Sequence, residues 1–137
     1  MPIFTVHMKE NAFTSAEKNG LADALALALH EAMGSPMEDQ FTFFHEHKED
    51  NFYVTRTFPN MKRTDKRILV NVTFNVSRTL EQKKKLAELI TRYAMEKAGV
   101  GFDDVAIMMY ALPLENMSFG RGEVITDETW RWTLSLQ

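Results

Sequence analysis

The sequence predicts an α/β fold in which two tandem β-α-β units form a four-stranded sheet with both helices on one face. Three observations predict it: an internal repeat, a strand of period two, and matching start and stop signals on two helices. The repeat emerges when the 137-residue chain is shifted by 65 positions against itself, as from Ile3 to Ile68. The other matched identities are Thr14/Thr79, Lys18/Lys83, Leu21/Leu86, Ala22/Ala87, Glu31/Glu96, Gly34/Gly99 and Asp39/Asp104.

The strand of period two begins at Ile68. From there to Val76, Ile, Val and Phe side chains alternate with mostly polar ones, a pattern typical of a strand with one buried face. The second strand of each unit is expected at about Gln40–His47 and Val105–Leu112. Since a helix separates the strands of each unit, we expect right-handed crossovers between parallel strands.

Both helices have the same boundary signals. Each begins with a threonine followed three residues later by Glu or Gln, which is a capping box, and each ends at a glycine suited to a helix C-cap. Leucines and an isoleucine recur at helical spacing between these signals. The signals are Thr14, Glu17 and Gly34 in the first unit and Thr79, Gln82 and Gly99 in the second.

The chain is expected to form one domain over residues 1–137. The repeat covers about residues 2–47 and 67–112, and residues 113–137 form a C-terminal loop and tail. Within the tail, Val124–Leu136 is expected to form a short hairpin or an edge strand. With both helices on one face, the other sheet face would expose apolar side chains, which favours a homo-oligomer.

Composition excludes several classes of function. The chain has no cysteine, which excludes disulfides, thiol nucleophiles and zinc–thiolate sites. A net charge of −3 gives no basic field for nucleic acid. No apolar stretch approaches the roughly 20 residues of a membrane span, and no signal peptide is evident, so a cytoplasmic protein is expected. No P-loop or dinucleotide fingerprint occurs, and no cofactor is expected.

Pro2 is the first candidate for chemistry. Removal of Met1, usual before a small residue, would leave a secondary amine whose reference pKa lies at about 7.7–8.0. Partial burial would lower that pKa further, so the amine could transfer protons near neutral pH. The alternative is structural, because proline is also acceptable as the first residue of a strand.

Arg78 and Asp39 are the next candidates. Arg78 follows the strand that begins at Ile68, and a guanidinium at such a strand end can hold a carboxylate through two hydrogen bonds. The alternative is an ordinary surface arginine. Asp39 opens the second strand, but its repeat counterpart Asp104 indicates that an aspartate at this position can serve a purely structural role.

A metal site is not expected, although the chain has four histidines, His7, His30, His45 and His47. His45 and His47 share one strand face, and Glu46 points to the other. No further ligand is placed by sequence spacing to complete a site with them.

Several motifs together resemble the tautomerase superfamily. They are Pro2 behind Met1, Asp39 after a Gly34-x-Pro36 turn, Arg63-Thr64-Asp65 before the third strand, SRT-x-EQK at 77–83 and EN-x-SFG-x-G at 115–122. The EN-x-SFG-x-G segment and Arg63-Thr64-Asp65 are more narrowly similar to the group around malonate semialdehyde decarboxylase. The resemblance runs from Pro2 to about Glu123 and implies a homotrimer without cofactor.

The resemblance also implies roles for individual residues. Pro2 would be the general acid/base, Arg78 the carboxylate anchor, and Asp39 a group that positions or activates water or substrate. Phe119 would form part of an apolar pocket wall. The chain departs from the decarboxylase at Val76, where that enzyme has a second arginine, and Arg121 is a candidate replacement cation.

Three functions remain open from the sequence. The first is a cofactor-independent tautomerase that acts on a small α-keto or enol carboxylate. The second is a decarboxylase or hydratase of a 3-oxo acid like malonate semialdehyde. The third is a catalytically inactive trimeric module, which a retained Met1 would favour because Pro2 would then be an amide.

Overall fold

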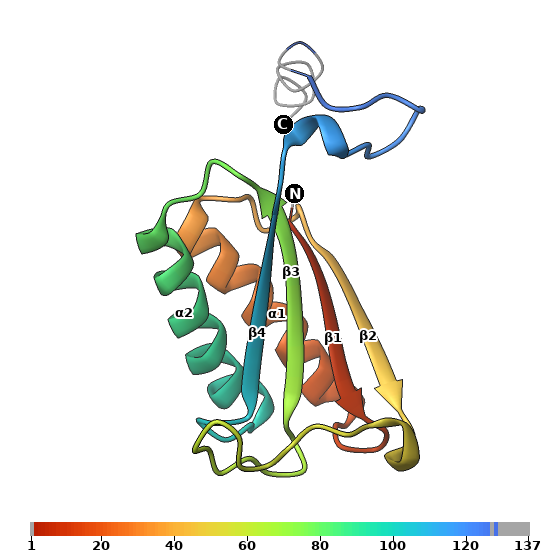
Figure 1. Cartoon of the computed structure of the whole chain (residues 1–137), viewed down its shortest axis with the longest axis vertical. Helices are drawn as coiled ribbons and strands as arrows, with labels where there is room; N and C mark the ends of the chain where they lie inside the picture. Colours follow the sequence, from red (N-terminus) through yellow and green to blue (C-terminus); the bar gives the residue numbers. More distant parts are fainter. Residues whose placement is uncertain (1, 127, 129–137) are drawn as a thin grey trace.

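The structure is a computed structural model that describes residues 2–126 and 128 (Figure 1). The elements are β1 (Ile3–Lys9), α1 (Ser15–Met33), β2 (Phe41–His47), the 3-10 turn η1 (Glu49–Asn51), β3 (Ile68–Asn75), α2 (Leu80–Ala98), β4 (Val105–Leu112) and the 3-10 turn η2 (Leu114–Asn116). They confirm the predicted order of strands and helices. The hairpin or edge strand expected over Val124–Leu136 lies almost wholly outside the described residues.

The sheet has the order β2-β1-β3-β4. Within each unit the strands are parallel, β1 with β2 and β3 with β4, whereas β1 and β3 are antiparallel and join the two units. Both helices cover the same face of the sheet (Figure 1). This confirms the predicted fold. Because the units run in opposite directions, the start of β1 and β2 lies at the same end of the sheet as the finish of β3 and β4.

Both helix boundaries form as the sequence predicts. The Thr14 hydroxyl accepts from the Glu17 N–H at 3.1 Å, and the Thr79 hydroxyl accepts from the Gln82 N–H at 3.2 Å. In each case the side chain at the third helical position also accepts from the threonine N–H, which completes a capping box. Gly34 and Gly99 end the helices with φ of 72° and 70°, a left-handed conformation that glycine adopts without strain.

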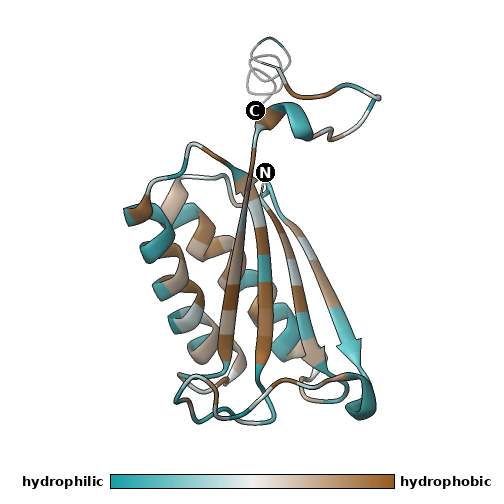
Figure 2. Cartoon of the chain, in the orientation of Figure 1, coloured by the Kyte–Doolittle hydropathy of each residue, from teal (hydrophilic) through white to brown (hydrophobic). Residues whose placement is uncertain are grey.

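The core lies between the sheet and the helices. Alternate side chains of β1 and β3 are buried there, and Figure 2 shows hydrophobic residues on the strands and on the helices. These strand side chains pack against leucines of both helices and an isoleucine of α2. The largest fully buried side chains of this layer are Phe4, Val6, Met8, Ile68, Val70 and Val72 from the sheet and Leu21, Leu25, Leu86, Leu89 and Ile90 from the helices.

The two helices approach closely at Gly20. A Cβ atom there would lie 2.1 Å from the Lys97 carbonyl oxygen, far inside van der Waals contact. We expect Gly20→Ala to lower the free energy of unfolding by about 1–3 kcal/mol through overpacking. The gain in helix propensity, about 1 kcal/mol, offsets only part of this loss. Urea denaturation measures the difference. Asn19→Ala, on the exposed neighbouring position, is the control and should stabilise slightly; equal effects of both substitutions would contradict the close approach.

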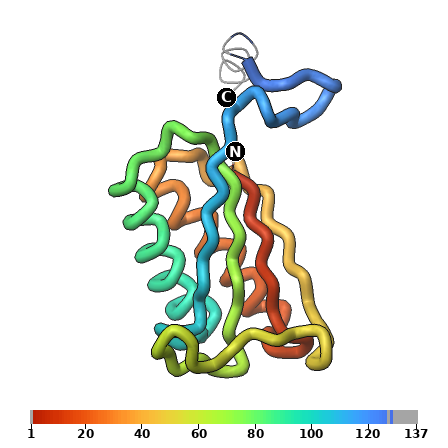
Figure 3. Tube along the Cα trace, in the orientation of Figure 1, coloured from red at the N-terminus to blue at the C-terminus, as the bar shows by residue number. Residues whose placement is uncertain are grey.

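The face opposite the helices carries apolar side chains. Phe43 of β2 with Met108 and Tyr110 of β4 are about half exposed there, and we call this surface the open sheet face. Among the described residues, no helix combines the length and the apolar character that a membrane span needs. Figure 3 follows the chain beyond β4, where it continues past the end of the sheet at which β1 begins.

Candidate active site

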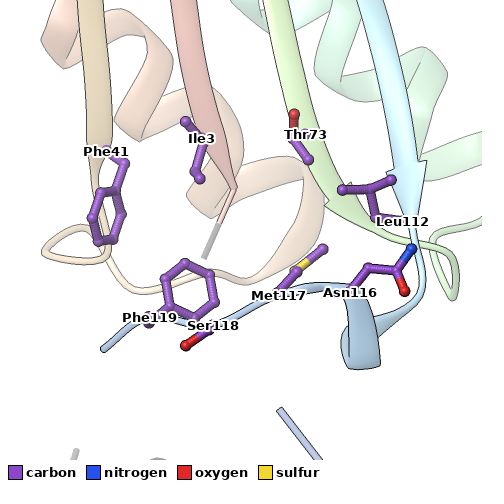
Figure 4. A pocket seen from close by; sticks show the side chains of 8 residues that line it. All are labelled: Ile3, Phe41, Thr73, Leu112, Asn116, Met117, Ser118 and Phe119. Carbon is purple, nitrogen blue, oxygen red and sulfur yellow. The ribbon is translucent and has the colours of Figure 1, made fainter. Parts of the chain in front are cut away.

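A cavity of about 350 Å³ lies at the end of the sheet where β1 begins and β4 finishes (Figure 4). This volume is within the range of small-molecule sites, roughly 300–1,000 Å³. Its walls come from all four strands and from the segment after β4. The lining residues are Ile3, Phe41, Thr73, Leu112, Asn116, Met117, Ser118 and Phe119.

Strand register brings the inner wall together. Ile3 of β1 pairs with Phe41 of β2 on one side and with Thr73 of β3 on the other. Paired residues in a sheet project to the same face, so these three side chains stand side by side. Thr73 and Leu112 belong to the parallel strands β3 and β4, which both finish at this end. The site therefore occupies one end of the face that the helices do not cover.

The outer wall comes from the loop after β4. The Asn116 N–H donates to the Pro113 carbonyl at 3.0 Å, and the Ile125 N–H donates to the Met117 carbonyl at 2.9 Å, which ties a later part of the loop back onto it. Ile125 is buried. These contacts place Met117 and its neighbours over the end of the sheet.

Two phenylalanine rings form one side of the cavity. The centroids of Phe41 and Phe119 are 5.7 Å apart with their planes inclined by 41°. Figure 4 shows this pair on one side, with Leu112 and Asn116 on the other. Phe119, which the resemblance implied for the apolar wall, thus lines the cavity. The residues that line the described cavity carry hydroxyl and amide groups at Thr73, Asn116 and Ser118 and no ionised group.

Pro2 lies at the same end of the sheet. It is buried and directly precedes Ile3, which lines the cavity. Removal of Met1 would therefore leave a free amine directly before β1, the strand whose first residue forms part of the inner wall.

Arg78 has a structural contact that the sequence did not predict. Its Nη1 donates to the Met33 carbonyl at 3.0 Å, at the C-terminal end of α1, where a cation is favoured by the helix dipole. The side chain is half-buried, and this burial lowers its pKa, although the group stays protonated at neutral pH. Its Nε is buried without a hydrogen-bond partner among the described residues. Arg78 is not among the residues that line the cavity.

Asp39 and Arg121 also lie outside the cavity lining. The Asp39 N–H donates to the Pro36 carbonyl at 3.1 Å, in the turn that leads from α1 to β2, and the residue is half-buried. Arg121 is exposed in the loop after Phe119, with φ of 60°. The structure thus gathers Pro2, Asp39, Arg78 and Phe119 at one end of the sheet but lines the cavity with Phe119 alone of these.

A histidine cluster lies farther along the open sheet face. His7 of β1 pairs with His45 of β2, and its Nδ1 lies 2.8 Å from the Nε2 of His47. The ring centroids of His7 are 5.1 Å from His45 and 5.0 Å from His47. The sequence predicted that His45 and His47 share a face but missed His7, which joins them only through the strand pairing. Among the described residues, no group of three or more histidines and carboxylates is arranged to hold a metal ion.

This cluster predicts a pH dependence of stability. Partial burial, and then the nearby His47 and His45, lower the pKa of His7 from 6.5. The unfolded chain therefore binds this proton more readily, so the contribution to stability is present above pH 6.5 and is lost as the pH falls through the folded pKa. We expect His7→Gln to reduce the loss of unfolding free energy between pH 7.5 and 5 by at most about 1 kcal/mol, because solvent screens the part-buried ring. Thermal denaturation across this pH range measures the difference, and parallel Tm profiles for wild type and His7→Gln would contradict the coupling.

Comparisons with known proteins agree on one family. Two family models, each described as a tautomerase enzyme, match residues 2–58 and 39–120. The chain is 29% identical over 126 residues to the probable tautomerase YusQ of Bacillus subtilis strain 168, covering 89% of this chain and 95% of that protein.

Solved structures give the same result. Malonate semialdehyde decarboxylase is 25% identical with a TM-score of 0.81, over 88% of this chain and 92% of that one. A fused 4-OT symmetric trimer is 23% identical with a TM-score of 0.74, over 89% and 94% of the two chains, and this likeness establishes a shared fold.

Proposed function

The chain belongs to the tautomerase family, and on that premise we propose that it catalyses cofactor-independent keto–enol proton transfer on a small α-keto or enol carboxylate, with the Pro2 nitrogen as general acid/base. The observation that carries the proposal is the cavity at the start of β1, lined by the residue that directly follows Pro2. The similarity to a probable tautomerase supports it.

The proposed chemistry needs Met1 to be removed. The free secondary amine of Pro2, with a reference pKa of about 7.7–8.0, is partly neutral near pH 7. Burial at this position favours the neutral form further. Neutral Pro2 accepts the enol O–H proton, and the electron pair left on oxygen forms the carbonyl. The electron pair of the C=C bond then takes a proton from the resulting ammonium and forms the new C–H bond. The reaction is an isomerisation in which no atom is lost.

Binding of the substrate carboxylate is assigned to groups at the same end of the sheet. Arg78 is the proposed anchor, because its guanidinium lies at this end of the sheet and its Nε–H has no hydrogen-bond partner among the described residues, while Nη1 donates to the Met33 carbonyl. Asp39 is proposed to position substrate or water, and Arg121 to supply a second cation. Phe119 is the proposed apolar wall beside the reacting carbon.

The experiment that tests the proposal measures ketonisation directly. The processed chain, with Met1 removed as checked by intact mass, is mixed with the enol form of a 2-oxo acid. Loss of the enol absorbance and deuterium incorporation at C3 in D2O report proton transfer. We expect rates well above those of buffer at pH 7–8. Rates equal to buffer with fully processed protein would exclude the tautomerase and favour the inactive module.

Decarboxylation or hydration of a 3-oxo acid is the second candidate. It is favoured by the similarity to malonate semialdehyde decarboxylase, which was analysed for decarboxylase and hydratase activities. Val76 is an argument against this candidate, because the decarboxylase has a second arginine at this place. Without it, one of two expected carboxylate contacts is missing, and a charged hydrogen bond contributes about 1.5–3 kcal/mol. Detection of acetaldehyde after incubation with malonate semialdehyde distinguishes decarboxylation from tautomerisation.

We further propose that the chain assembles as a homo-oligomer, specifically a trimer. The open sheet face leaves large apolar side chains about half exposed, and a chain of the same fold forms a symmetric trimer. Sedimentation equilibrium measures the mass of the assembly, and a monomer at micromolar concentration would contradict this assignment. A cytoplasmic location stays a prediction.

A further inference from the structure

The turn between β3 and α2, which carries Arg78, is shaped by the side chain of Asn75. Asn75 is the last residue of β3 and pairs with Leu112, which lines the cavity. Its Oδ1 accepts from the Ser77 N–H at 2.8 Å and from the Ser77 hydroxyl. An asparagine oxygen that bonds the N–H two residues on forms an Asx turn, which bends the backbone locally. This turn therefore sets the direction in which the chain leaves the sheet, and Arg78 is the next residue along it.

The other side of Arg78 is held by the capping box of α2, in which the Thr79 N–H donates to the Gln82 Oε1 at 2.9 Å. Both backbone neighbours of Arg78 thus have an N–H group that bonds a side chain. At its tip, the Arg78 Nη1 donates to the Met33 carbonyl at 3.0 Å, and its Nε has no partner among the described residues. A guanidinium presents its donors to a carboxylate in a fixed plane, so its value as an anchor depends on where the backbone places it.

The first unit indicates that this Asx turn is not needed to begin a helix. The position 65 residues before Asn75 holds Glu10, and the chain there bends at Asn11, whose φ is 65°. The position 65 residues before Arg78 holds Phe13, which is buried in the core. The helix of this unit nevertheless begins with the same capping box. The asparagine turn therefore accompanies the arginine and not the start of a helix.

From these contacts we infer that Asn75 is a positioning residue, which holds the turn that places the Arg78 guanidinium for a carboxylate. The inference rests on the proposed function, because it takes Arg78 as the carboxylate anchor, but binding of a carboxylate does not need Pro2 to react. Asn75 acts through Arg78 and does not itself bind the ligand. Loss of the turn should therefore weaken the binding of a carboxylate and leave a neutral ligand of the same shape unaffected.

Equilibrium binding of butanoate and of its neutral amide, butanamide, tests the inference. Both are unreactive and similar in size, and NMR titration of the processed protein gives their Kd values. We expect the wild-type chain to bind butanoate at least about tenfold more tightly than butanamide, because a charged hydrogen bond contributes about this factor or more. Asn75→Ala should reduce this preference to about threefold or less, with butanamide binding unchanged. A preference that stays at the wild-type value would overturn the inference.

A rescue and a double variant distinguish positioning from direct contact and from a general structural role. Asn75→Ser keeps an oxygen that can accept from the same N–H, although more weakly, and should restore part of the preference. In the Arg78→Ala background, Asn75→Ala should change neither affinity, because it acts only through the arginine. A further loss in the double variant, or a serine variant no better than the alanine variant, would overturn the positioning role.

Thr55→Ala is the matched control. The Thr55 hydroxyl oxygen accepts from the Thr57 N–H at 3.2 Å, which is a turn of the same kind in the connection between β2 and β3, at the end of the sheet opposite the cavity. Its removal should leave both affinities unchanged. A loss of the butanoate preference in this control would overturn the assignment to Asn75.

The inference and the proposed function fail in distinguishable ways. Ketonisation together with a butanoate preference that Asn75→Ala does not alter would retain the proposed function and overturn the positioning role. Loss of the preference in Asn75→Ala, in a chain that does not ketonise the enol, would support the positioning role and overturn the tautomerase assignment. A wild-type chain without a preference for butanoate would overturn the carboxylate anchor and the positioning role together.

Discussion

Replacing Pro2 by alanine is expected to lower kcat/KM for ketonisation by about 10²–10⁴-fold, the usual contribution of a positioned general acid/base. The variant is still trimmed by the same rule and so keeps an amine at the chain start, but a primary amine without the ring constraint is less well positioned. The loss should appear mainly in kcat. Stopped-flow absorbance on the enol, with intact mass on the same sample, provides the measurement.

A blocked amine is the sharper control for this prediction. An uncleavable extension before Pro2 converts its nitrogen into an amide, which cannot accept a proton at neutral pH. We expect such a chain to fold normally, because Pro2 precedes β1 and lies outside its strand pairing, and to ketonise no faster than buffer. Undiminished activity in the extended chain would show that Pro2 is not the general base and that another group accepts the proton.

The fold could be predicted from the sequence because its signals are local and occur twice. A threonine with Glu or Gln three residues on, such as Thr14 with Glu17, needs no distant partner to start a helix. The left-handed glycine at Gly34 likewise marks a helix end by its own conformational freedom. The repeat contains the same signals in the second unit, where Gln82 belongs to the capping box and Gly99 ends the helix.

The site could be predicted only in outline, because its geometry depends on contacts between distant segments. The family resemblance implied Phe119, but the facing ring of Phe41 is brought there by the pairing of β1 with β2. Thr73 reaches the cavity through the antiparallel pairing of the two units, a register that periodicity alone does not set. Similarly, the contact of Arg78 with the end of α1 joins residues 45 positions apart in the chain.

Asp104 is expected to contribute more to stability than any other single polar side chain considered above. It is fully buried, and its carboxylate accepts from the Thr64 N–H and hydroxyl at 2.6 Å each and from the Gly101 N–H at 2.7 Å. These bonds hold the long connection before β3 against the turn before β4. They support the structural interpretation of an aspartate at this repeat position.

Asp104→Ala should therefore lower the free energy of unfolding by about 3 kcal/mol or more, since hydrogen bonds to a charged group contribute about 1.5–3 kcal/mol each and the donors lose their partner. That is a large part of the total of about 5–15 kcal/mol for a typical domain. Asp104→Asn, which keeps one acceptor oxygen, should lose less. Urea denaturation at neutral pH ranks the variants.

Asp103 offers a matched control on the adjacent position. Among the described residues its carboxylate accepts one bond, from the Lys62 N–H at 2.8 Å near the surface, so Asp103→Ala should cost no more than about 1 kcal/mol. Asp104 lies at the end of the sheet opposite the cavity, because it precedes β4, whose far end lines the site. The folded fraction of Asp104→Ala should thus retain wild-type kcat at low temperature. Equal destabilisation of the two variants, or a loss of kcat without a loss of stability, would contradict a structural role for Asp104.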